Sequence, residues 1–363
     1  MLDQDLVAWL RLTLTPGVGR AKTRQLLTAF GWPTAVFEQG ISDLRTVVGP
    51  ALANKLLAPL PDHTQATIEH TRRWLAGGDN RHILAVGDPG YPLELLEIPD
   101  PPLLLYVLGQ LEVLQPSTHR LAVVGSRNPT TQGVENAKHF AQSLGAAGVC
   151  VVSGLALGID AAAHEGALAG GGCTVAVVGT GLDRVYPKQH LELAHAVAAQ
   201  GAIISEYPIG TGPLAAHFPQ RNRVISGLSR GTLVVEATLK SGSLITARTA
   251  LEQGRDVYAI PGSIHAPQAK GCHELIKQGA QLVESAADIL GSSASVRATA
   301  PAMARATDTA LLAALGHDPM GLDGLQARTG WTVDRLQATL LELELLGQVQ
   351  RLPGGLYAQL VRA

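Results

Sequence analysis

Residues 121–131 read LAVVGSRNPTT, in which four apolar residues lead into a Gly-Ser-Arg turn and then into a helical pattern. This order is typical of a buried strand that enters a helix through a tight loop. A helix N-terminus has unpaired N–H groups and partial positive charge, so such a loop favours a phosphate. Arg127 adds a bidentate guanidinium beside Ser126. The stretch predicts a phosphate site; the alternative is a tight turn with an exposed arginine.

Five further short apolar runs follow, and helical stretches separate them. They are Val149–Val152, Thr174–Val178, Ala202–Ile204, Thr232–Val235 and Val257–Ile260. Near-continuous apolar strands that alternate with helices indicate a parallel sheet covered by helices on both faces. The sequence therefore predicts an α/β fold, with the sheet domain spanning residues 81–290.

The N-terminal residues 1–80 have a helical pattern and no strand alternation. Helices are expected at Leu2–Thr13, Arg20–Phe30 and His63–Ala76. The Pro-Gly-Val-Gly turn at 16–19 is similar to a helix–hairpin–helix, whose glycine amides can contact a backbone phosphate. A simple turn between two helices explains it equally well. We expect a small helical domain here.

The C-terminal end begins with an Ala/Ser-rich stretch, residues 291–306, which reads as a linker. Residues 307–363 then predict three helices and a β-hairpin, the pattern of a winged-helix domain. The helices are expected at Thr309–Leu315, Leu322–Thr329 and Val333–Gly347, and the hairpin around 353–355. This module holds four arginines against six acidic residues. Because a DNA-reading helix is normally basic, a regulatory or protein-contact role is favoured.

Composition excludes several classes of protein. The 363 residues are 46% hydrophobic and only 16% charged, which excludes disorder for most of the chain. Every apolar run is too short to span a membrane. The early acidic residues are unlike a signal peptide, so a cytoplasmic location is expected. The cysteines Cys150, Cys173 and Cys272 lie far apart, with no spacing typical of a disulfide framework or a metal site.

Two glycine-rich loops are possible cofactor or metal sites, but their residues do not fit either kind of site. Gly179-Thr180-Gly181 lacks the third glycine of a dinucleotide fingerprint, no acidic residue follows the second strand, and no Walker sequence occurs. We therefore expect no cofactor. Asp160 and His164 lie four residues apart and share a helix face, but no third metal ligand is visible. Asp160 is expected to stabilise the helix N-terminus instead.

The segment 217–248 is strongly basic. It contains five cationic residues and one acid, Glu236. Phe218 stands beside three strong donors, Arg221, Asn222 and Arg223. Lys240 and Ser241 open a further helix after a strand. Several phosphate sites along one sheet edge suit a polyanion, and an exposed phenylalanine suits a stacked base. The alternative is a core Phe218 with solvated arginines.

Seven motifs, in order, resemble the DprA/Smf family of DNA-processing proteins. They are GSR (125–127), SGLALGID (153–160) with His164, GTGLDRVYP (179–187), ISEYP (204–208), FPQRNRVISGLS (218–229), VVEATLKSGSLIT (234–246) and AIPG (259–262). The resemblance is strong over residues 85–290. It implies an extended Rossmann-like fold flanked by an N-terminal helical domain similar to SAM or helix–hairpin–helix domains and by a C-terminal winged helix.

The resemblance also implies a function. Family members bind single-stranded DNA and help to load RecA in natural transformation and recombination, without enzymatic activity. Arg127 and Lys188 would hold phosphates, and Phe218 would contact a base. The same groove would be lined by Ser126, Arg221, Asn222, Arg223, Lys240 and Ser241. A homodimer through the sheet domain is implied around His273–Val283.

One alternative is an enzyme. Related Rossmann folds of the lysine-decarboxylase type carry nucleotide N-glycosidases, and Glu236 offers a carboxylate near the candidate phosphate sites. Those enzymes have a PGG-x-GT-x-x-E signature, which this sequence lacks. A second alternative makes the winged helix a sequence-specific DNA reader, which its acidic residues Asp334, Glu342 and Glu344 disfavour.

Overall fold

The computed structural model describes residues 3–296, 311–312, 314–315, 320–345, 349–352 and 356–359. The chain divides into two compact units, Met1–Leu290 and Gly291–Ala363. The first unit holds the helical N-terminal residues and the large sheet. A separation of residues 1–80 from 81–290 as independent domains stays a prediction.

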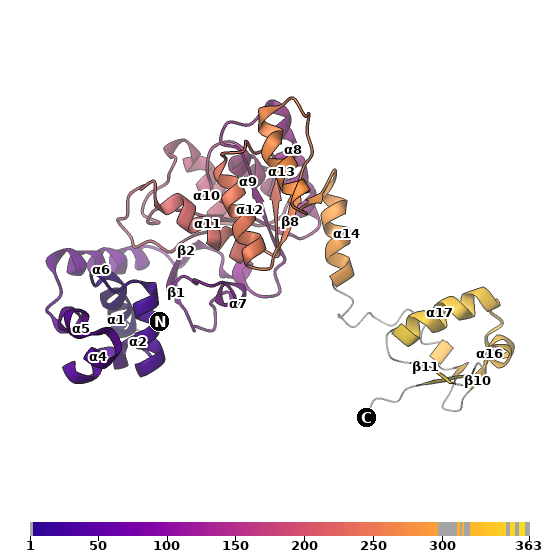
Figure 1. The fold of residues 1–363 in the computed structure, drawn as a ribbon, viewed down its shortest axis with the longest axis horizontal. Coiled ribbons are helices and arrows are strands. Elements are labelled where there is room, and N and C mark those ends of the chain that lie inside the picture. The colour runs from indigo at the N-terminus through magenta and orange to yellow at the C-terminus, as the bar shows by residue number, and fades with distance from the viewer. Residues whose placement is uncertain are drawn as a thin grey trace. The chain divides into compact units, whose positions relative to one another are not determined.

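Six helices form the N-terminal part of the first unit, drawn in indigo to purple in Figure 1. They are α1 (Asp3–Leu14), α2 (Arg20–Phe30), α3 (Pro33–Phe37), α4 (Ile41–Val48), α5 (Pro50–Leu57) and α6 (Asp62–Leu75). The expected helices correspond to α1, α2 and α6, while α3, α4 and α5 were not expected. Their apolar faces share a small core around Leu26, Leu44 and Leu56. Gly17 adopts φ 92° in the turn before α2, a conformation that favours glycine.

A nine-stranded sheet follows. Its strands are β1 (Arg81–Ala85), β2 (Leu104–Gly109), β3 (Arg120–Val124), β4 (Cys150–Ser153), β5 (Thr174–Val177), β6 (Ala202–Ser205), β7 (Gly231–Val234), β8 (Asp256–Ala259) and β9 (Gln281–Leu282). The order across the sheet is β1-β2-β6-β5-β4-β3-β7-β8-β9. Strands β3 to β9 run parallel, and β2 is antiparallel to both β1 and β6. The six predicted strands are β3 to β8.

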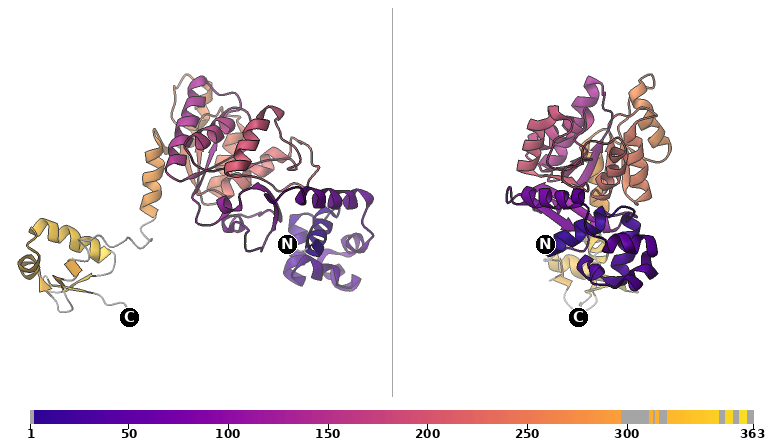
Figure 2. Two further views of the ribbon diagram at one scale, coloured as in Figure 1. Left: turned by 180° about the vertical axis from the view of Figure 1, so that it is seen from behind. Right: turned by 90° about the vertical axis from the view of Figure 1, so that its left-hand side faces the viewer.

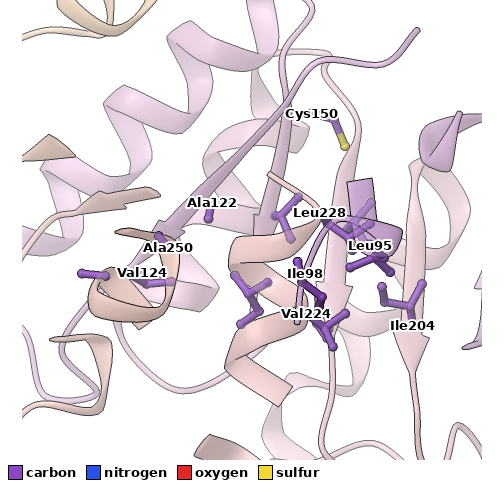
Figure 3. Packing of buried hydrophobic residues seen from close by; sticks show 14 of the residues in the cluster. Leu95, Ile98, Ala122, Val124, Cys150, Ile204, Val224, Leu228 and Ala250 are labelled. Carbon is purple, nitrogen blue, oxygen red and sulfur yellow. The ribbon is translucent and has the colours of Figure 1, made fainter. Parts of the chain in front are cut away.

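Helices cover both faces of the sheet (Figure 2). They are α7 (Leu93–Leu96), α8 (Thr131–Ala146), α9 (Ile159–Ala169), α10 (Leu191–Gln200), α11 (His217–Gly227), α12 (Gly242–Glu252), α13 (Lys270–Lys277) and α14 (Ala286–Val296), with short 3₁₀ turns η1 (Leu111–Leu114), η2 (Lys188–His190) and η3 (Pro267–Ala269). Helices α8 and α9 pack on one face. On the other face, Val224 and Leu228 pack with Leu95 and Ile98 in one apolar cluster (Figure 3).

The predicted linker is partly helical. Helix α14 continues through residues 291–296, within the stretch 291–306 that the sequence predicted as a linker. Alanine and serine do not interrupt a helix in the way that proline does, so α14 can extend beyond its buried residue Ile289. Residues 297–306 of the predicted linker lie outside the described residues.

The second unit has the winged-helix arrangement. It contains β10 (Met320–Gly321), α16 (Leu322–Thr329), α17 (Val333–Leu345), β11 (Val349–Leu352) and β12 (Leu356–Gln359), with strand order β10-β12-β11. Leu325, Leu336 and Leu340 are buried in its core with Val349. Of the predicted first helix, residues 311–312 and 314–315 are helical. The turn at 353–355 lies outside the described residues.

Candidate nucleic-acid interface

A cleft of about 710 Å³ opens where the strands of the sheet end. The chain leaves β3 toward β4 on one side and leaves β7 toward β8 on the other, so the loops after β3 and β7 diverge. Open α/β sheets bind ligands at such a point. The lining residues come from the end of β3, from the loops after β3, β4, β5, β6 and β7, and from helices α9, α11 and α12. They are Val124, Gly125, Arg127, Ala156, Asp160, Tyr186, Pro213, Ala215, Phe218, Pro219, Arg221, Asn222, Ile225, Thr238, Ser241, Gly242, Ser243, Ile245 and Thr246.

The loop after β3 is held to the start of α9. The N–H of Ile159 donates to the carbonyl of Ser126 at 3.1 Å. A Cβ on Gly125 would lie 2.6 Å from the Ile159 side chain, so a larger residue would push the two segments apart. The hydroxyl of Ser126 accepts from the N–H of Asn128 at 3.1 Å. These contacts leave Arg127 exposed at the mouth of the cleft.

Glu236 stabilises the other end of this loop. Its two carboxylate oxygens accept hydrogen bonds from the N–H of Thr130 at 2.9 Å and from the Thr130 hydroxyl at 2.6 Å. Thr130 in turn caps α8 by accepting from the N–H of Gly133 at 3.0 Å. Glu236 is not among the residues that line the cleft. Its carboxylate therefore has a structural role, and this weakens the enzymatic alternative.

Two aromatic rings and a guanidinium meet at one side of the cleft. The guanidinium carbon of Arg127 lies 5.5 Å from the ring centroid of Phe218. The ring of Tyr186 lies 5.6 Å from that of Phe218, tilted by 38°. Phe218 is half-buried, whereas Tyr186 is 47% exposed. Sequence reasoning did not select Tyr186 as a site residue; its only signal was its place in the GTGLDRVYP motif at 179–187.

Arg221 forms part of the cleft floor. It is 4% exposed, and its Nη2 donates to the carbonyl of Gly154 at 2.8 Å. Its Nε and Nη1 are buried without a hydrogen-bond partner among the described residues. Burial lowers the pKa of Arg221 to about 10, so the group stays charged at neutral pH. Asp160 attracts it, although burial raises the pKa of that carboxyl. The floor therefore contains a buried cation beside a buried carboxyl group.

The N-terminus of α12 also faces the cleft. Ser241 caps this helix, since its hydroxyl accepts from the N–H of Ser243 at 3.4 Å and shares a hydrogen bond with the Ser243 hydroxyl at 2.7 Å. Both residues line the cleft together with Gly242. The partial positive charge of this helix end adds to that of Arg127 and Arg221.

The predicted site residues fall into three groups. Those that line the cleft are Arg127, Phe218, Arg221, Asn222 and Ser241. Lys188 and Lys240 are exposed on neighbouring segments and are not lining residues, and Ser126 lies in the loop beside Arg127. Arg223, which lies away from the cleft, forms the third group.

The prediction that Arg223 lines this groove is corrected by its ion pairs. Its guanidinium contacts Glu206 and lies 3.5 Å from Asp100. Because successive helix residues point about 100° apart, Arg223 leaves α11 in a different direction from Asn222 and Arg221. The side chain is 13% exposed.

The N-terminal hairpin contributes to the same ion-pair cluster. Arg20 lies 2.7 Å from Asp100 and 3.1 Å from Glu206, and Arg24 lies 2.8 Å from Asp100. These two arginines therefore hold the helical module against the sheet. That role does not support the helix–hairpin–helix interpretation of this turn.

Asp160 and His164 do not form an acid–base pair at the cleft. The Nδ1 of His164 lies 2.7 Å from the Thr174 hydroxyl, and the residue is completely buried. Burial lowers the pKa of His164 to about 3. Among the described residues, no group of three or more His, Cys, Asp or Glu side chains could hold a metal ion.

These features define a class of protein: a Rossmann-like α/β protein whose cleft offers cations, a helix N-terminus and stacked aromatic rings to a polyanion. A family model described as DNA recombination-mediator protein A matches residues 82–294, and the DprA winged-helix model matches residues 295–355. The chain thus belongs to the DprA/Smf family and is a DNA-processing recombination mediator. The predicted family and fold class are confirmed.

Several relatives are similar over most of their length. Protein Smf of Escherichia coli is 43% identical over 310 residues, covering 82% of each chain. The structure of DNA processing protein A from Streptococcus pneumoniae superposes with a TM-score of 0.67 at 37% identity, covering 80% of this chain and 98% of that one. DNA processing protein A of Helicobacter pylori, described for its single-stranded DNA binding mode, gives 0.54 at 28% identity, covering 60% and 96%.

No helix in the described part of the chain combines the length and the apolar character needed to cross a bilayer.

Proposed function

We propose that this cleft binds single-stranded DNA and that the protein delivers the strand to RecA. The observation that carries the proposal is the meeting of Arg127, Phe218 and Tyr186 at the mouth of a cleft whose floor contains the buried Arg221. A strand needs both a cationic path for its backbone and exposed rings for its bases. The H. pylori relative, which is described as binding single-stranded DNA, supports the proposal.

The backbone would follow the cationic side chains. Arg127 is exposed and presents a planar fork that matches a phosphate. The capped N-terminus of α12 offers a second phosphate position, and the exposed Lys188 and Lys240 extend the path beyond the cleft. The net charge of −2 offers no general attraction to DNA, so affinity depends on this local cluster.

The bases would stack on the rings. Phe218 is already in contact with Arg127 and Tyr186, which leaves the exposed Tyr186 as the larger free surface. A base stacks on an aromatic ring without regard to its identity, because every base has a π face. Bases in a duplex are already stacked and paired, so this geometry favours a single strand and no particular sequence.

No chemical step is required of the protein in this proposal, and we therefore assign it no enzymatic activity. The carboxylate that an N-glycosidase would need is the Glu236 side chain, and both of its oxygens are engaged by Thr130. Release of free base from nucleoside monophosphates, lost in Glu236→Gln, would overturn this assignment.

We place the homodimer contact at the β9 edge of the sheet, within His273–Val283. Strand β9 ends the described sheet, so one of its edges lies open for pairing. Leu282 on this strand is 45% exposed, and Ile264 in the loop after β8 is 68% exposed. We propose that the protein acts in the cytoplasm, where RecA and the exposed strand are available to it.

A salt series on two DNA forms tests the function. The purified protein is titrated with labelled oligo-dT and with a duplex of equal length. We expect preference for the single strand and a linear fall of log K with log salt. RecA filament formation on strands covered by a single-strand binding protein is then measured with and without this protein. Equal affinity for both DNA forms, or no affinity at low salt, would reject the proposal.

A further inference from the structure

Two of the three cysteines meet inside the sheet, although 22 residues separate them in the sequence. Val151 and Thr174 are paired across β4 and β5. Cys150 and Cys173 each stand one residue earlier, so they face one another at the amino-terminal ends of these strands. The N–H of Val151 donates to the carbonyl of Cys173 at 3.2 Å, which fixes this register. Sequence spacing gave no sign of a cysteine pair.

Both side chains lie on the same face of the sheet. Cys150 belongs to a cluster of buried apolar residues (Figure 3). This cluster also contains Val152 and Val175, and Cys173 packs against it. Neighbouring strands lie about 4.8 Å apart. Disulfide-bonded cysteines have Cα atoms about 4.4–6.8 Å apart. The register therefore places the two Cα atoms within the range that a disulfide requires.

The two thiols differ in accessibility and in acidity. Cys150 is completely buried, whereas Cys173 is only partly buried. The interaction of the two thiols lowers the pKa of Cys173 to about 7. The same interaction, together with burial, raises the pKa of Cys150. Cys173 is thus both the more accessible and the more acidic thiol of the pair, and these two properties favour reactivity.

We propose that Cys150 and Cys173 form a reversible oxidation site, in which peroxide converts the thiol pair into an intramolecular disulfide. The Cys173 thiolate attacks one oxygen of hydrogen peroxide, the O–O bond breaks, and the departing hydroxide takes a proton to become water. The sulfur of Cys150 then attacks the Cys173 sulfenic acid, and a second water leaves with the Cys150 proton. Two thiols are oxidised to one disulfide, and one peroxide is reduced to two waters.

The location predicts what the bond would change. It would join the amino-terminal ends of β4 and β5, while the cleft lies at the carboxyl ends of the strands. Oxidation should therefore raise the thermal stability of the sheet and leave the cleft residues in place. A thiol reductant would restore the pair, as expected for a site in a reduced compartment.

Thiol counting on the full-length protein tests the proposal. The denatured, reduced protein should titrate as three thiols, and the peroxide-treated protein as one. A non-reducing digest should yield a peptide pair that joins Cys150 to Cys173, and dithiothreitol should reverse the change. Three remaining thiols, a link between two chains, or overoxidation of Cys173 with free Cys150 would overturn the inference.

Cys272 provides the internal control. It is buried beneath β7, where its Sγ lies 3.6 Å from the carbonyl oxygens of Val234 and Val235. Cys272→Ser should still lose two thiols on oxidation, and Cys173→Ser should lose none. In Cys150→Ala, Cys173 has no partner, so a dimedone-reactive sulfenic acid should accumulate there. None of these measurements involves DNA, so their outcome is independent of the proposed function.

Discussion

The guanidinium carbon of Arg127 lies 5.5 Å from the centre of the Phe218 ring, although the two residues are 91 positions apart. Arg127 is presented by the loop after β3, and Phe218 by the first turn of α11. The sheet topology brings both to the same edge. A phosphate on the guanidinium and a base on the ring would then belong to adjacent parts of one nucleotide chain.

Arg127→Ala should weaken binding to all single strands by a similar factor. The residue contacts the backbone in our proposal, so its loss removes one released counterion and should reduce the salt slope by about 1. Fluorescence anisotropy with oligo-dT and oligo-dC across a salt series measures both quantities. Arg45→Ala is the matched control, because Arg45 is an exposed arginine on α4 in the helical module. An unchanged slope in Arg127→Ala would remove this residue from the interface.

Tyr186→Ala should reduce single-strand affinity by about 1–3 kcal/mol, the usual contribution of one stacked base. Tyr186→Phe keeps the ring and removes only the hydroxyl, so it should bind almost as the parent protein does. A 2-aminopurine base in the oligonucleotide reports stacking directly through its fluorescence, which should change with the parent and with Tyr186→Phe only. If both variants lose affinity equally, the hydroxyl rather than the ring is what contacts DNA.

Gly154→Ala should destabilise the sheet domain by about 1–3 kcal/mol, as overpacked core substitutions do. A Cβ at this position would lie 1.7 Å from Nη1 of Arg221, and the buried guanidinium has little room to move. Urea denaturation measures the loss. Gly291→Ala is the matched control, since no atom lies within 4 Å of its added Cβ. Gly154→Ala should also weaken DNA binding, because the displaced Arg221 disturbs the cleft floor.

Local sequence patterns were sufficient to predict strands β3 to β8 and the loop that follows β3. The runs that became β3 to β8 are short, apolar and bounded by glycine, and the loop at Gly125 to Arg127 is contiguous in sequence. Their positions in the fold could therefore be predicted without coordinates. Strands β1 and β2 were missed because they belong to an antiparallel extension, in which only the four-residue helix α7 separates the two strands.

Contacts between distant segments could not be predicted in the same way. Arg223 and Arg221 are the same residue type and lie two positions apart in the sequence. Only the fold shows that Glu206 and Asp100 lie beside Arg223. Tyr186 became a candidate only when its ring was found beside Phe218. The meeting of Cys150 with Cys173 likewise depends on strand register, which spacing along the chain does not reveal.

The unfolding free energy should decrease as the pH falls below about 6.5, in part because of His164. Burial lowers the pKa of this imidazole to about 3, while the unfolded chain has the ordinary value of about 6.5. Between these values the unfolded state binds the proton and the folded state does not. The stabilisation is therefore complete above the unfolded pKa and is lost toward the folded one, at up to about 1.4 kcal/mol per pH unit. Asp160 acts in the opposite direction at the acidic end, because its pKa is raised in the folded state.

Urea denaturation of the parent and of His164→Gln between pH 7 and pH 5 separates the two effects. The variant should show a shallower dependence on pH whatever its absolute stability, and parallel curves would mean that His164 does not titrate on unfolding.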